Sequence, residues 1–298
     1  MSPSQPPEVL ALSDALHLRF GERRRCDEPL AAHTTLRVGG PADLWLTVTQ
    51  LDELIEAVAL ARQRGVPVFL LGSGANLLVS DRGVRGLVVQ NRCQRVTLPG
   101  NETPGEASEQ PHVMVESGVV LPSLANRLAR QGLSGLEWAV GVPGTIGGAV
   151  VNNTGSYGTS MADCLARVEL YNDADGQRSW RPVDWFEYKY RSSRLKRLEP
   201  GGPKQYLVLQ AELALSRKSP AEIEEQMADY GQRRRTTQPP GATIGSMFKN
   251  PPGDYDVRLI EAAGLKGTQI GGAQISPVHA NFFVNLGEAR AAEFAALI

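Results

Sequence analysis

The sequence predicts a fold of mixed helices and strands that is divided between more than one structural unit. Three observations carry this prediction: a β-α-β pattern that begins at Leu44, a series of short apolar strands separated by turn residues, and a shift in composition at Ser219. With 298 residues, the chain is long enough for two or three subdomains that share a substantial core.

The first third of the chain contains the clearest regular pattern. Residues 1–32 are rich in Pro and Arg, and we expect them to form a loose tail with a short amphipathic piece. Residues 44–48 (LWLTV) predict a strand, and the stripe of apolar residues that follows predicts a helix that ends at Gly65. The next strand is expected at residues 66–71 (VPVFLL), which completes the β-α-β unit.

Short strands and turns follow through the middle of the chain. The expected strands are residues 77–80, 86–90, 112–117, 166–172 and 205–215. A helix is expected at residues 123–131, and the polar residues 99–112 are expected to form an exposed loop. Turn residues at 173–176 and at 199–204 predict hairpin connections.

The last part of the chain begins with a helix-start signal. Ser219 is followed by Pro at the first helical position and by Glu222, which predicts a helix to about Arg233 and then a Pro-rich linker. We therefore expect a domain boundary near residue 216. Residues 287–298 start another helix without a C-terminal stop signal, so either this helix frays or the chain is shorter than its fold intends.

The composition argues against several functional classes. The 31 basic and 32 acidic residues give no electrostatic reason to expect nucleic acid or an anionic membrane as a partner. Cys26, Cys93 and Cys164 are far apart and the four His are scattered, so neither a disulfide framework nor a metal site is expected. No signal peptide and no membrane-spanning apolar run is evident, and a reduced cytoplasmic location is therefore the default expectation.

A glycine-rich stretch at residues 70–81 (LLGSGANLLVSD) has two interpretations. A Rossmann loop would need a third glycine where Leu77 stands, and a helix where another apolar run follows. An anion could instead lie in a nest of backbone N–H groups, with Gly72 and Gly74 allowing close approach and Ser73 and Asn76 adding side-chain donors. The alternative is an ordinary turn between two strands.

A second glycine-rich segment lies at residues 141–148 (GVPGTIGG). Four glycines in eight residues should prevent a stable regular element, because glycine loses more backbone freedom than any other residue on folding. The segment could lie against a ligand, or it could mark a tight backbone crossing in the core. Two neutral glycine-rich loops together suit a diphosphate held by backbone amides, as in a dinucleotide such as FAD.

Taken together, the motifs resemble one family, the UDP-N-acetylenolpyruvoylglucosamine reductases (MurB). The blocks that carry the resemblance, in order along the chain, are residues 35–43, 71–79, 135–138, 141–148, 190–193, 245–251, 259–267 and 276–285. The segment between Arg191 and Ser246 is short, as in the subgroup without an extra tyrosine-bearing loop.

The resemblance implies an α+β fold. It consists of a two-lobed FAD-binding module of the PCMH/vanillyl-alcohol-oxidase type followed by a small α/β substrate-binding domain. The implied division is an N-terminal tail (1–32), a first lobe (33–98), a second lobe (99–216) and the substrate-binding domain (217–298). In such a fold FAD lies along loops between strands, which would explain the apolar run after Asn76.

The resemblance also implies roles for particular residues. Arg191 matches the arginine that stabilises negative charge on the substrate, and Ser246 matches the proton donor. The matched FAD-binding positions are Gly39, Gly40, Gly72, Ser73, Gly74, Asn76, Leu77, Pro143, Gly144, Thr145, Gly147 and Gly148. The matched substrate-binding positions are Tyr157, Gln238, Lys249 and Asn250.

The implied activity is NADPH-dependent reduction of an enolpyruvyl UDP-sugar to UDP-N-acetylmuramate, with FAD as cofactor. The family's third catalytic residue, a glutamate beyond the 276–285 block, has no counterpart before Ile298. A second hypothesis is therefore a truncated, weakly active or non-catalytic protein that binds flavin or the UDP-sugar. A third, another oxidase on the same scaffold, is disfavoured by residues 245–251.

Overall fold

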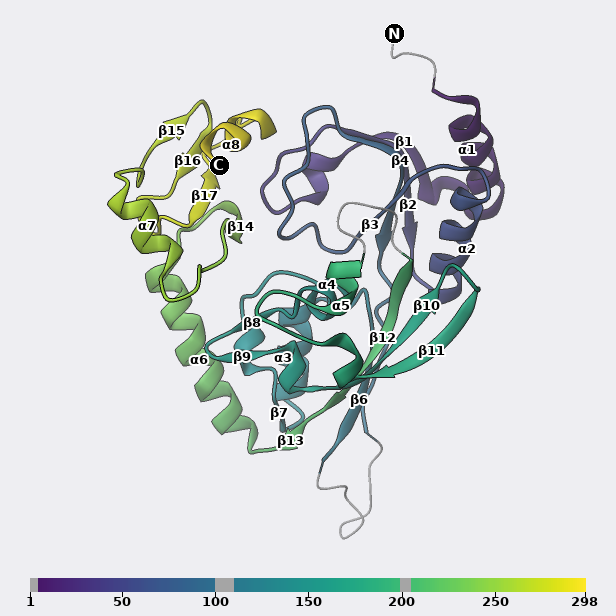
Figure 1. The fold of residues 1–298 in the computed structure, drawn as a ribbon. Coiled ribbons are helices and arrows are strands. Elements are labelled where there is room, and N and C mark those ends of the chain that lie inside the picture. Colours follow the sequence, from purple (N-terminus) through teal and green to yellow (C-terminus); the bar gives the residue numbers. More distant parts are fainter. Residues whose placement is uncertain (1–4, 100–109, 199–204) are drawn as a thin grey trace. The chain divides into compact units, whose positions relative to one another are not determined.

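The computed structural model describes residues 5–99, 110–198 and 205–298 (Figure 1). The chain divides into two compact units, both of them discontinuous in sequence. Unit 1 comprises Met1–Leu46, Leu60–Val89 and Arg233–Ile298, and unit 2 comprises Thr47–Ala59 and Gln90–Gln232. The division into four consecutive segments at residues 33, 99 and 217 stays a prediction.

Unit 1 contains a four-stranded sheet with the strand order β1-β2-β4-β3. Its strands are Arg24–Pro29 (β1), Pro41–Val48 (β2), Val68–Leu71 (β3) and Val84–Asn91 (β4). Helix α1 (Pro7–Phe20) and β1 occupy the range expected to be a loose tail with a short amphipathic piece, so the loose tail is wrong, whereas α1 is an amphipathic element there. The reason is burial: Leu12, Leu16 and Phe20 form an apolar stripe on α1 that is removed from water.

A second sheet of unit 1 lies in the last third of the chain and has the order β14-β17-β16-β15, with every pair antiparallel. Its elements are Ala242–Ser246 (β14), Asp256–Ala262 (α7), Gln269–Ile270 (β15), Ala273–Ile275 (β16), Phe282–Asn285 (β17) and Ala291–Leu297 (α8). Leu36 and Val38, from early in the chain, share one buried cluster with Phe283 and Phe294. The two ends of the sequence therefore build a common core within unit 1.

Unit 2 is built on a five-stranded antiparallel sheet with the order β11-β10-β12-β6-β5, of which the first four strands are labelled in Figure 1. Its strands are Val96–Thr97 (β5), His112–Glu116 (β6), Leu165–Asn172 (β10), Gln177–Pro182 (β11) and Tyr206–Ala214 (β12). Three helices lie wholly in this unit among the described residues, Leu121–Ala129 (α3), Ile146–Asn152 (α4) and Arg194–Leu198 (α5). Two more belong to it for most of their length, Leu51–Arg62 (α2) and Pro220–Thr237 (α6). Leu124, Ile146 and Met227 belong to a buried cluster with the apolar face of the sheet.

Short elements complete the chain. The two-stranded pairs are Leu133–Ser134 (β7) with Ser216–Arg217 (β13), and Gly155–Ser156 (β8) with Thr159–Ser160 (β9). The 3-10 turns are Gly21–Arg23 (η1), Leu30–His33 (η2), Glu137–Ala139 (η3), Met161–Asp163 (η4) and Val183–Phe186 (η5). In the described parts of the chain, no helix is long and apolar enough to cross a membrane.

The predicted elements differ from the observed ones at a few places. The strand expected at residues 77–80 is wrong, because this run has no strand geometry. Its apolar side chains nevertheless pack on the core, since Val79 belongs to one buried cluster, Leu77 packs against that cluster and Leu78 packs against another. The hairpin expected at 199–204 and most of the loop expected at 99–112 fall outside the described residues.

The helix-start signal at Ser219 is confirmed. The Ser219 hydroxyl accepts a hydrogen bond from the Glu222 N–H at 3.2 Å, and the Glu222 carboxylate accepts one from the Ser219 N–H at 3.1 Å. The helix that follows is longer than expected and ends at Thr237 rather than near Arg233. The expected hairpin turn at residues 173–176 is also confirmed, because Asn172 and Gln177 pair across it.

Candidate active site

The first glycine loop, in unit 1, requires glycine at position 74. Gly74 is buried at φ +67°, and a Cβ there would overlap the backbone oxygen of His33. The Thr35 N–H donates a hydrogen bond to the Gly74 carbonyl at 3.1 Å, so these two segments lie against one another. Asn76 also has a positive φ of 65°, as a nest-forming turn needs.

Two hydroxyl groups in this loop region lack protein partners. The side-chain oxygens of Ser73 and Thr35 are buried, and neither has a hydrogen-bond partner among the residues that the structure describes. A buried hydroxyl without a partner is unfavourable, so these atoms suit ligand oxygens such as those of a phosphate. Ser73 is one of the predicted FAD-binding residues, whereas Thr35 is not, although it begins the 35–43 block.

Gly40 is needed for packing within the protein. A Cβ at Gly40 would overlap the backbone oxygen of Asp81, and the Gly40 N–H donates to the Ser80 carbonyl at 2.9 Å. A Cβ at Gly39, which has φ +131°, would lie 2.9 Å from the Val79 Cβ. Both glycines therefore allow residues 39–40 to pack directly on residues 79–83.

The second glycine segment, in unit 2, contains the start of helix α4. The expectation that residues 141–148 form no regular element is therefore wrong from Ile146 onward. Tertiary contacts compensate for the glycines: the Ile146 N–H donates to the Val119 carbonyl at 2.9 Å, and the Gly147 N–H donates to the Ser117 carbonyl at 2.8 Å. The amides of 146 and 147 thus have partners within the protein.

Other positions of this segment face open space. A Cβ at Gly144 would have no atom within 4 Å, and one at Gly148 would meet only the Thr145 hydroxyl at 3.9 Å. Pro143 and Gly148 are exposed, while Thr145 is buried. The outer surface of this turn, at Pro143, Gly144 and Gly148, is therefore the part that can accommodate a ligand.

Arg191 lies in unit 2 in a tight turn, with φ +52°. Its guanidinium donates to the Gly155 carbonyl at 2.5 Å and to the Asn153 carbonyl at 3.4 Å. Both acceptors belong to the stretch that directly follows α4, so the structure brings Arg191 and the second glycine segment together. A guanidinium has five N–H donors, and three remain for other acceptors.

Tyr157 lies in the same part of unit 2. It occupies the turn of the β8–β9 hairpin with φ +56°, a strained value for a bulky residue. Its hydroxyl donates to the Tyr230 carbonyl at 3.1 Å, and the rings of Tyr157 and Tyr230 stack with their centroids 4.2 Å apart. Helix α6 therefore holds the Tyr157 ring.

Ser246 ends β14 in unit 1 and is exposed. The segment after it is fixed by Asn281, which is almost fully buried. The Asn281 amide oxygen accepts from the Phe248 N–H at 2.8 Å, and its amide nitrogen donates to the Phe248 carbonyl at 3.0 Å and to the Asp256 carboxylate. Asn281 was not predicted as a functional residue, although it belongs to the 276–285 block.

The remaining predicted residues also lie in unit 1. Lys249 and Asn250 are exposed in the loop after Ser246, and the Asn250 side chain accepts a hydrogen bond from the Asp256 N–H at 3.3 Å. Gln238 is half-buried directly after α6. Unit 1 thus contains Ser246 together with the first glycine loop, and unit 2 contains Arg191 together with the second.

His279 stands near Asn281 in this part of unit 1. Its ring accepts a hydrogen bond from the Asn281 N–H at 3.3 Å, and burial lowers its pKa. The carboxylate of Asp256 opposes this effect without cancelling it. A neutral imidazole is the form that can accept this bond, so His279 supports the fold of the loop.

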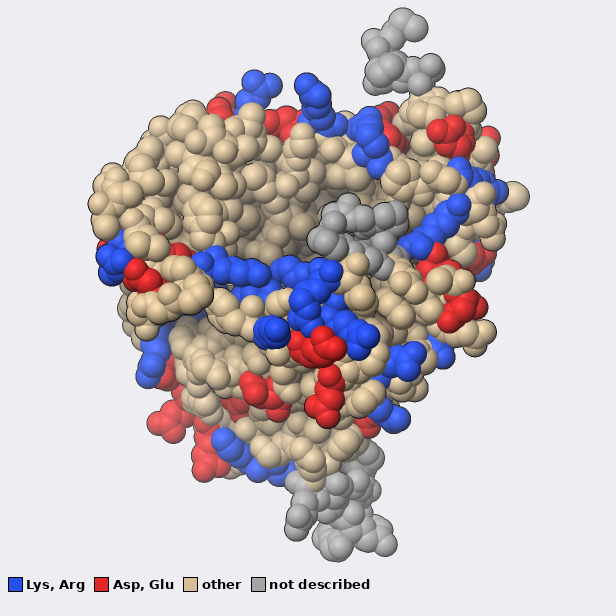
Figure 2. Space-filling view, in the orientation of Figure 1, with Lys and Arg blue, Asp and Glu red and all other residues tan. Residues whose placement is uncertain are grey.

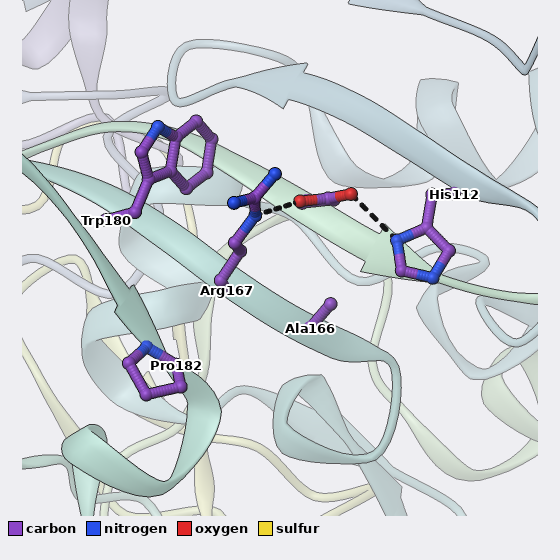
Figure 3. A pocket seen from close by; sticks show the side chains of 6 residues that line it. His112, Ala166, Arg167, Trp180 and Pro182 are labelled. Carbon is purple, nitrogen blue, oxygen red and sulfur yellow. Dashed lines mark hydrogen bonds and ion pairs between the residues drawn. The ribbon is translucent and has the colours of Figure 1, made fainter.

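A cavity of about 520 Å³ on the five-stranded sheet of unit 2 contains none of the predicted site residues (Figure 3). Its Glu212 carboxylate is bound by both Arg167 and His112, and the Arg167 guanidinium lies 4.6 Å from the centre of the Trp180 ring. Burial opposes ionisation of Glu212, but the hydrogen bonds from Arg167 and His112 lower its pKa. These charges compensate one another, so the cavity gives no reason to move the functional site there.

Basic and acidic side chains both occur on the face drawn in Figure 2, in keeping with the balanced composition. In the described residues, no three His, Cys, Asp or Glu side chains gather closely enough to hold a metal ion.

Comparison with known proteins gives the same assignment along the whole chain. A family model described as an FAD binding domain matches residues 42–180, and one described as the C-terminal domain of UDP-N-acetylenolpyruvoylglucosamine reductase matches residues 237–298. The reductase of Chloroflexus aggregans is 43% identical over 274 residues, which cover 92% of this chain and 90% of that protein. The reductase of Moorella thermoacetica is 41% identical over 98% of this chain and 91% of its own length.

A solved structure agrees with these relatives. The crystal structure of the reductase from Thermus caldophilus matches with a TM-score of 0.76 and 38% identity, over 92% of this chain and 91% of that one. The expected α+β fold, with an FAD-binding domain followed by a smaller C-terminal domain, is thereby confirmed. The chain belongs to the UDP-N-acetylenolpyruvoylglucosamine reductase family.

Proposed function

We propose that this protein reduces the enolpyruvyl group of UDP-N-acetylenolpyruvoylglucosamine with NADPH, giving UDP-N-acetylmuramate for peptidoglycan synthesis. The observation that carries the proposal is 43% identity to a reductase of this name over 92% of the chain. The reaction uses a UDP-sugar and a nicotinamide nucleotide, both of them small soluble molecules, and we place it in the cytoplasm.

Each of the two glycine loops contains proposed FAD-binding residues. Gly72, Ser73, Gly74, Asn76 and Leu77 form the first loop, and the unpartnered hydroxyls of Ser73 and Thr35 support a phosphate there. In the second loop, the open surface at Pro143, Gly144 and Gly148 would accept another part of the dinucleotide, with Thr145 and Gly147 shaping the turn. Gly39 and Gly40 would support the first loop through the packing of residues 39–40 on residues 79–83. When bound, FAD supplies hydride transfer from NADPH to the methylene carbon of the substrate.

Arg191 is the proposed electrostatic catalyst. Hydride addition to the methylene carbon places negative charge on the neighbouring carbon and its carboxylate. The remaining guanidinium N–H groups of Arg191 bind that carboxylate and stabilise the charge as it develops. Contacts to the Gly155 and Asn153 carbonyls hold the guanidinium in advance, so it need not reorganise during the reaction.

Ser246 is the proposed proton donor. The carbanion that follows hydride addition is strongly basic, so a hydroxyl can protonate it when correctly placed. Gly245 (φ +80°) forms a turn that only glycine adopts easily, and Asn281 fixes the chain on the other side of Ser246. Both features hold the hydroxyl at a defined position.

The proposed substrate-binding residues are Tyr157, Gln238, Lys249 and Asn250. Lys249 and Asn250 follow Ser246 in one exposed loop and can offer N–H donors to a diphosphate. The Tyr157 oxygen can still accept a hydrogen bond, because its own proton goes to the Tyr230 carbonyl.

The test is purification of the protein followed by measurement of bound flavin and of NADPH oxidation. We expect a yellow protein that oxidises NADPH only when the enolpyruvyl UDP-sugar is present. In Ser246→Ala, flavin reduction by NADPH should persist while reduction of the substrate collapses. A protein that cannot be reconstituted with FAD, or that holds FAD but never turns over, would overturn the proposal.

A further inference from the structure

Lys196 on helix α5 bridges the two segments that meet at Arg191. Its ammonium group donates to the Asn152 side-chain oxygen at 2.7 Å and to the backbone carbonyl of Arg191 at 3.4 Å. The Lys196 side chain is half-buried, so these contacts form away from bulk water. Charge-assisted hydrogen bonds of this kind are stronger than neutral ones.

The network continues from Asn152 into helix α4. The Asn152 amide nitrogen donates to the Gly148 carbonyl at 3.0 Å, one turn back in the helix. A hydrogen-bonded path therefore runs from Gly148, in the proposed flavin segment, through Asn152 and Lys196 to the main chain of Arg191. Every member of this path belongs to unit 2.

The backbone of Arg191 needs such support. A non-glycine residue at φ +52° is strained, and this conformation persists only where the surroundings determine it. Residues 189–192 form a tight turn closed by two hydrogen bonds between Lys189 and Ser192, each 3.0 Å long. The side chain of the buried Ser193 anchors the same turn to α4 by donating to the Val151 carbonyl at 2.6 Å.

Lys196 differs from these other anchors because it brings a charged group to the carbonyl of Arg191. Removing the ammonium would leave that carbonyl and the Asn152 oxygen without their common donor, so the turn, although Lys189 and Ser192 could still pair, would open more often. The guanidinium would keep its hydrogen bonds to residues 153 and 155 and its contact with the Tyr190 ring, but the main chain that carries it would be less firmly fixed.

We propose that Lys196 is a positioning residue, which fixes the main chain of Arg191 against the glycine segment of α4 so that the guanidinium meets the substrate carboxylate in the correct orientation. The inference rests on the proposed role of Arg191. It concerns substrate reduction, because the carboxylate that Arg191 is proposed to bind belongs to the substrate.

The test compares the two half-reactions in the flavin-loaded protein. In Lys196→Met, anaerobic reduction of the flavin by NADPH should stay within about twofold of the unmodified rate. Reoxidation by the enolpyruvyl UDP-sugar should slow by at least about tenfold, and the effect should be larger on kcat than on KM. The reason is that a displaced Arg191 guanidinium stabilises the charge developing on the substrate carboxylate less well in the transition state. Lys196→Arg should restore much of the rate, and Lys189→Met, an exposed lysine of the same turn, is the matched control.

A second measurement needs no turnover. Hydrogen exchange at the Ser192 amide, which closes the turn, should be at least about tenfold faster in Lys196→Met than in the unmodified protein, and unchanged in Lys189→Met. Unchanged exchange, or reoxidation as fast as in the unmodified protein, would overturn the inference. An unmodified protein that holds no flavin would count against the proposed function instead, and the exchange experiment would still decide the role of Lys196.

Discussion

Replacing Asn281 with alanine should destabilise unit 1 and disorder the segment that follows Ser246. The buried amide side chain makes two hydrogen bonds with the main chain of Phe248 and one with the carboxylate of Asp256. Alanine would remove all three bonds, and the Asp256 carboxylate that loses one of them is buried.

The size of the effect follows from these contacts. Two neutral hydrogen bonds contribute about 1 kcal/mol each and a bond to a charged group about 2 kcal/mol, so we expect a loss of about 4 kcal/mol in the free energy of unfolding. For a protein of this size such a loss corresponds to a fall of about 10 °C in the melting temperature. The position of Ser246 depends on the same contacts, so substrate reduction should fall more than flavin reduction.

Differential scanning calorimetry of the flavin-free protein measures the stability, and the two half-reactions measure the function. Asn126→Ala is the matched control, because Asn126 is an exposed asparagine with one local hydrogen bond to the Pro122 carbonyl. It should change the melting temperature by no more than about 1 °C, as expected for a surface change of about 0.5 kcal/mol or less. A melting temperature for Asn281→Ala within about 2 °C of the unmodified value would refute the reasoning.

Three further predictions concern other parts of the molecule. Burial raises the pKa of Cys93 and of Cys164 to about 12, so an Ellman titration at pH 8 should detect one fast thiol, the exposed Cys26, and three after denaturation. The pKa of Glu212 lies below its usual value of 4.5, so its ion pairs stabilise the folded state above that pH. Glu212→Gln should therefore lower the melting temperature at pH 7. The difference in melting temperature between the variant and the unmodified protein should shrink as the pH falls below 4.5. Gly74→Ala would force a Cβ into a backbone oxygen at a φ of +67°, so the purified variant should carry much less FAD, measured by the ratio of absorbance at about 450 and 280 nm.

Strand and helix positions could be predicted from the sequence where the pattern is local. The Ser219 cap and the hairpin between Asn172 and Gln177 depend on neighbours within a few residues, and both are confirmed. Residues 77–80 illustrate the limit: their apolar side chains pack on the core, yet hydrogen bonding in this region joins Ser80 to Gly40, a partner that the local pattern does not reveal.

The same distinction applies to the glycine segment and to the N-terminal region. Glycine content predicted no helix at residues 146–148, but the Val119 and Ser117 carbonyls satisfy the first amides of α4 from outside the helix. The N-terminal region, expected to be mostly a loose tail, forms a helix whose Leu12, Leu16 and Phe20 are buried, followed by a strand. In both cases tertiary packing outweighs local propensity.

Sequence motifs identify some residues of the proposed site and not others. Arg191 and Ser246 could be identified because they belong to the sequence blocks that carry the family resemblance, and their roles remain predictions. Lys196 and Asn281 act on other residues through hydrogen bonds, and Asn281 reaches Phe248 across 33 positions of the chain. Such partners become visible only when the fold brings them together.

The shared core of Leu36, Val38, Phe283 and Phe294 has a consequence for biosynthesis. During translation the first strands of unit 1 leave the ribosome long before the segment that completes their core, whereas most of unit 2 is one uninterrupted stretch. The nascent N-terminal strands therefore expose apolar surface to solvent while unit 2 is synthesised. Slow, chaperone-sensitive maturation of unit 1 and early protease resistance of unit 2 are the expected signature on stalled ribosomes.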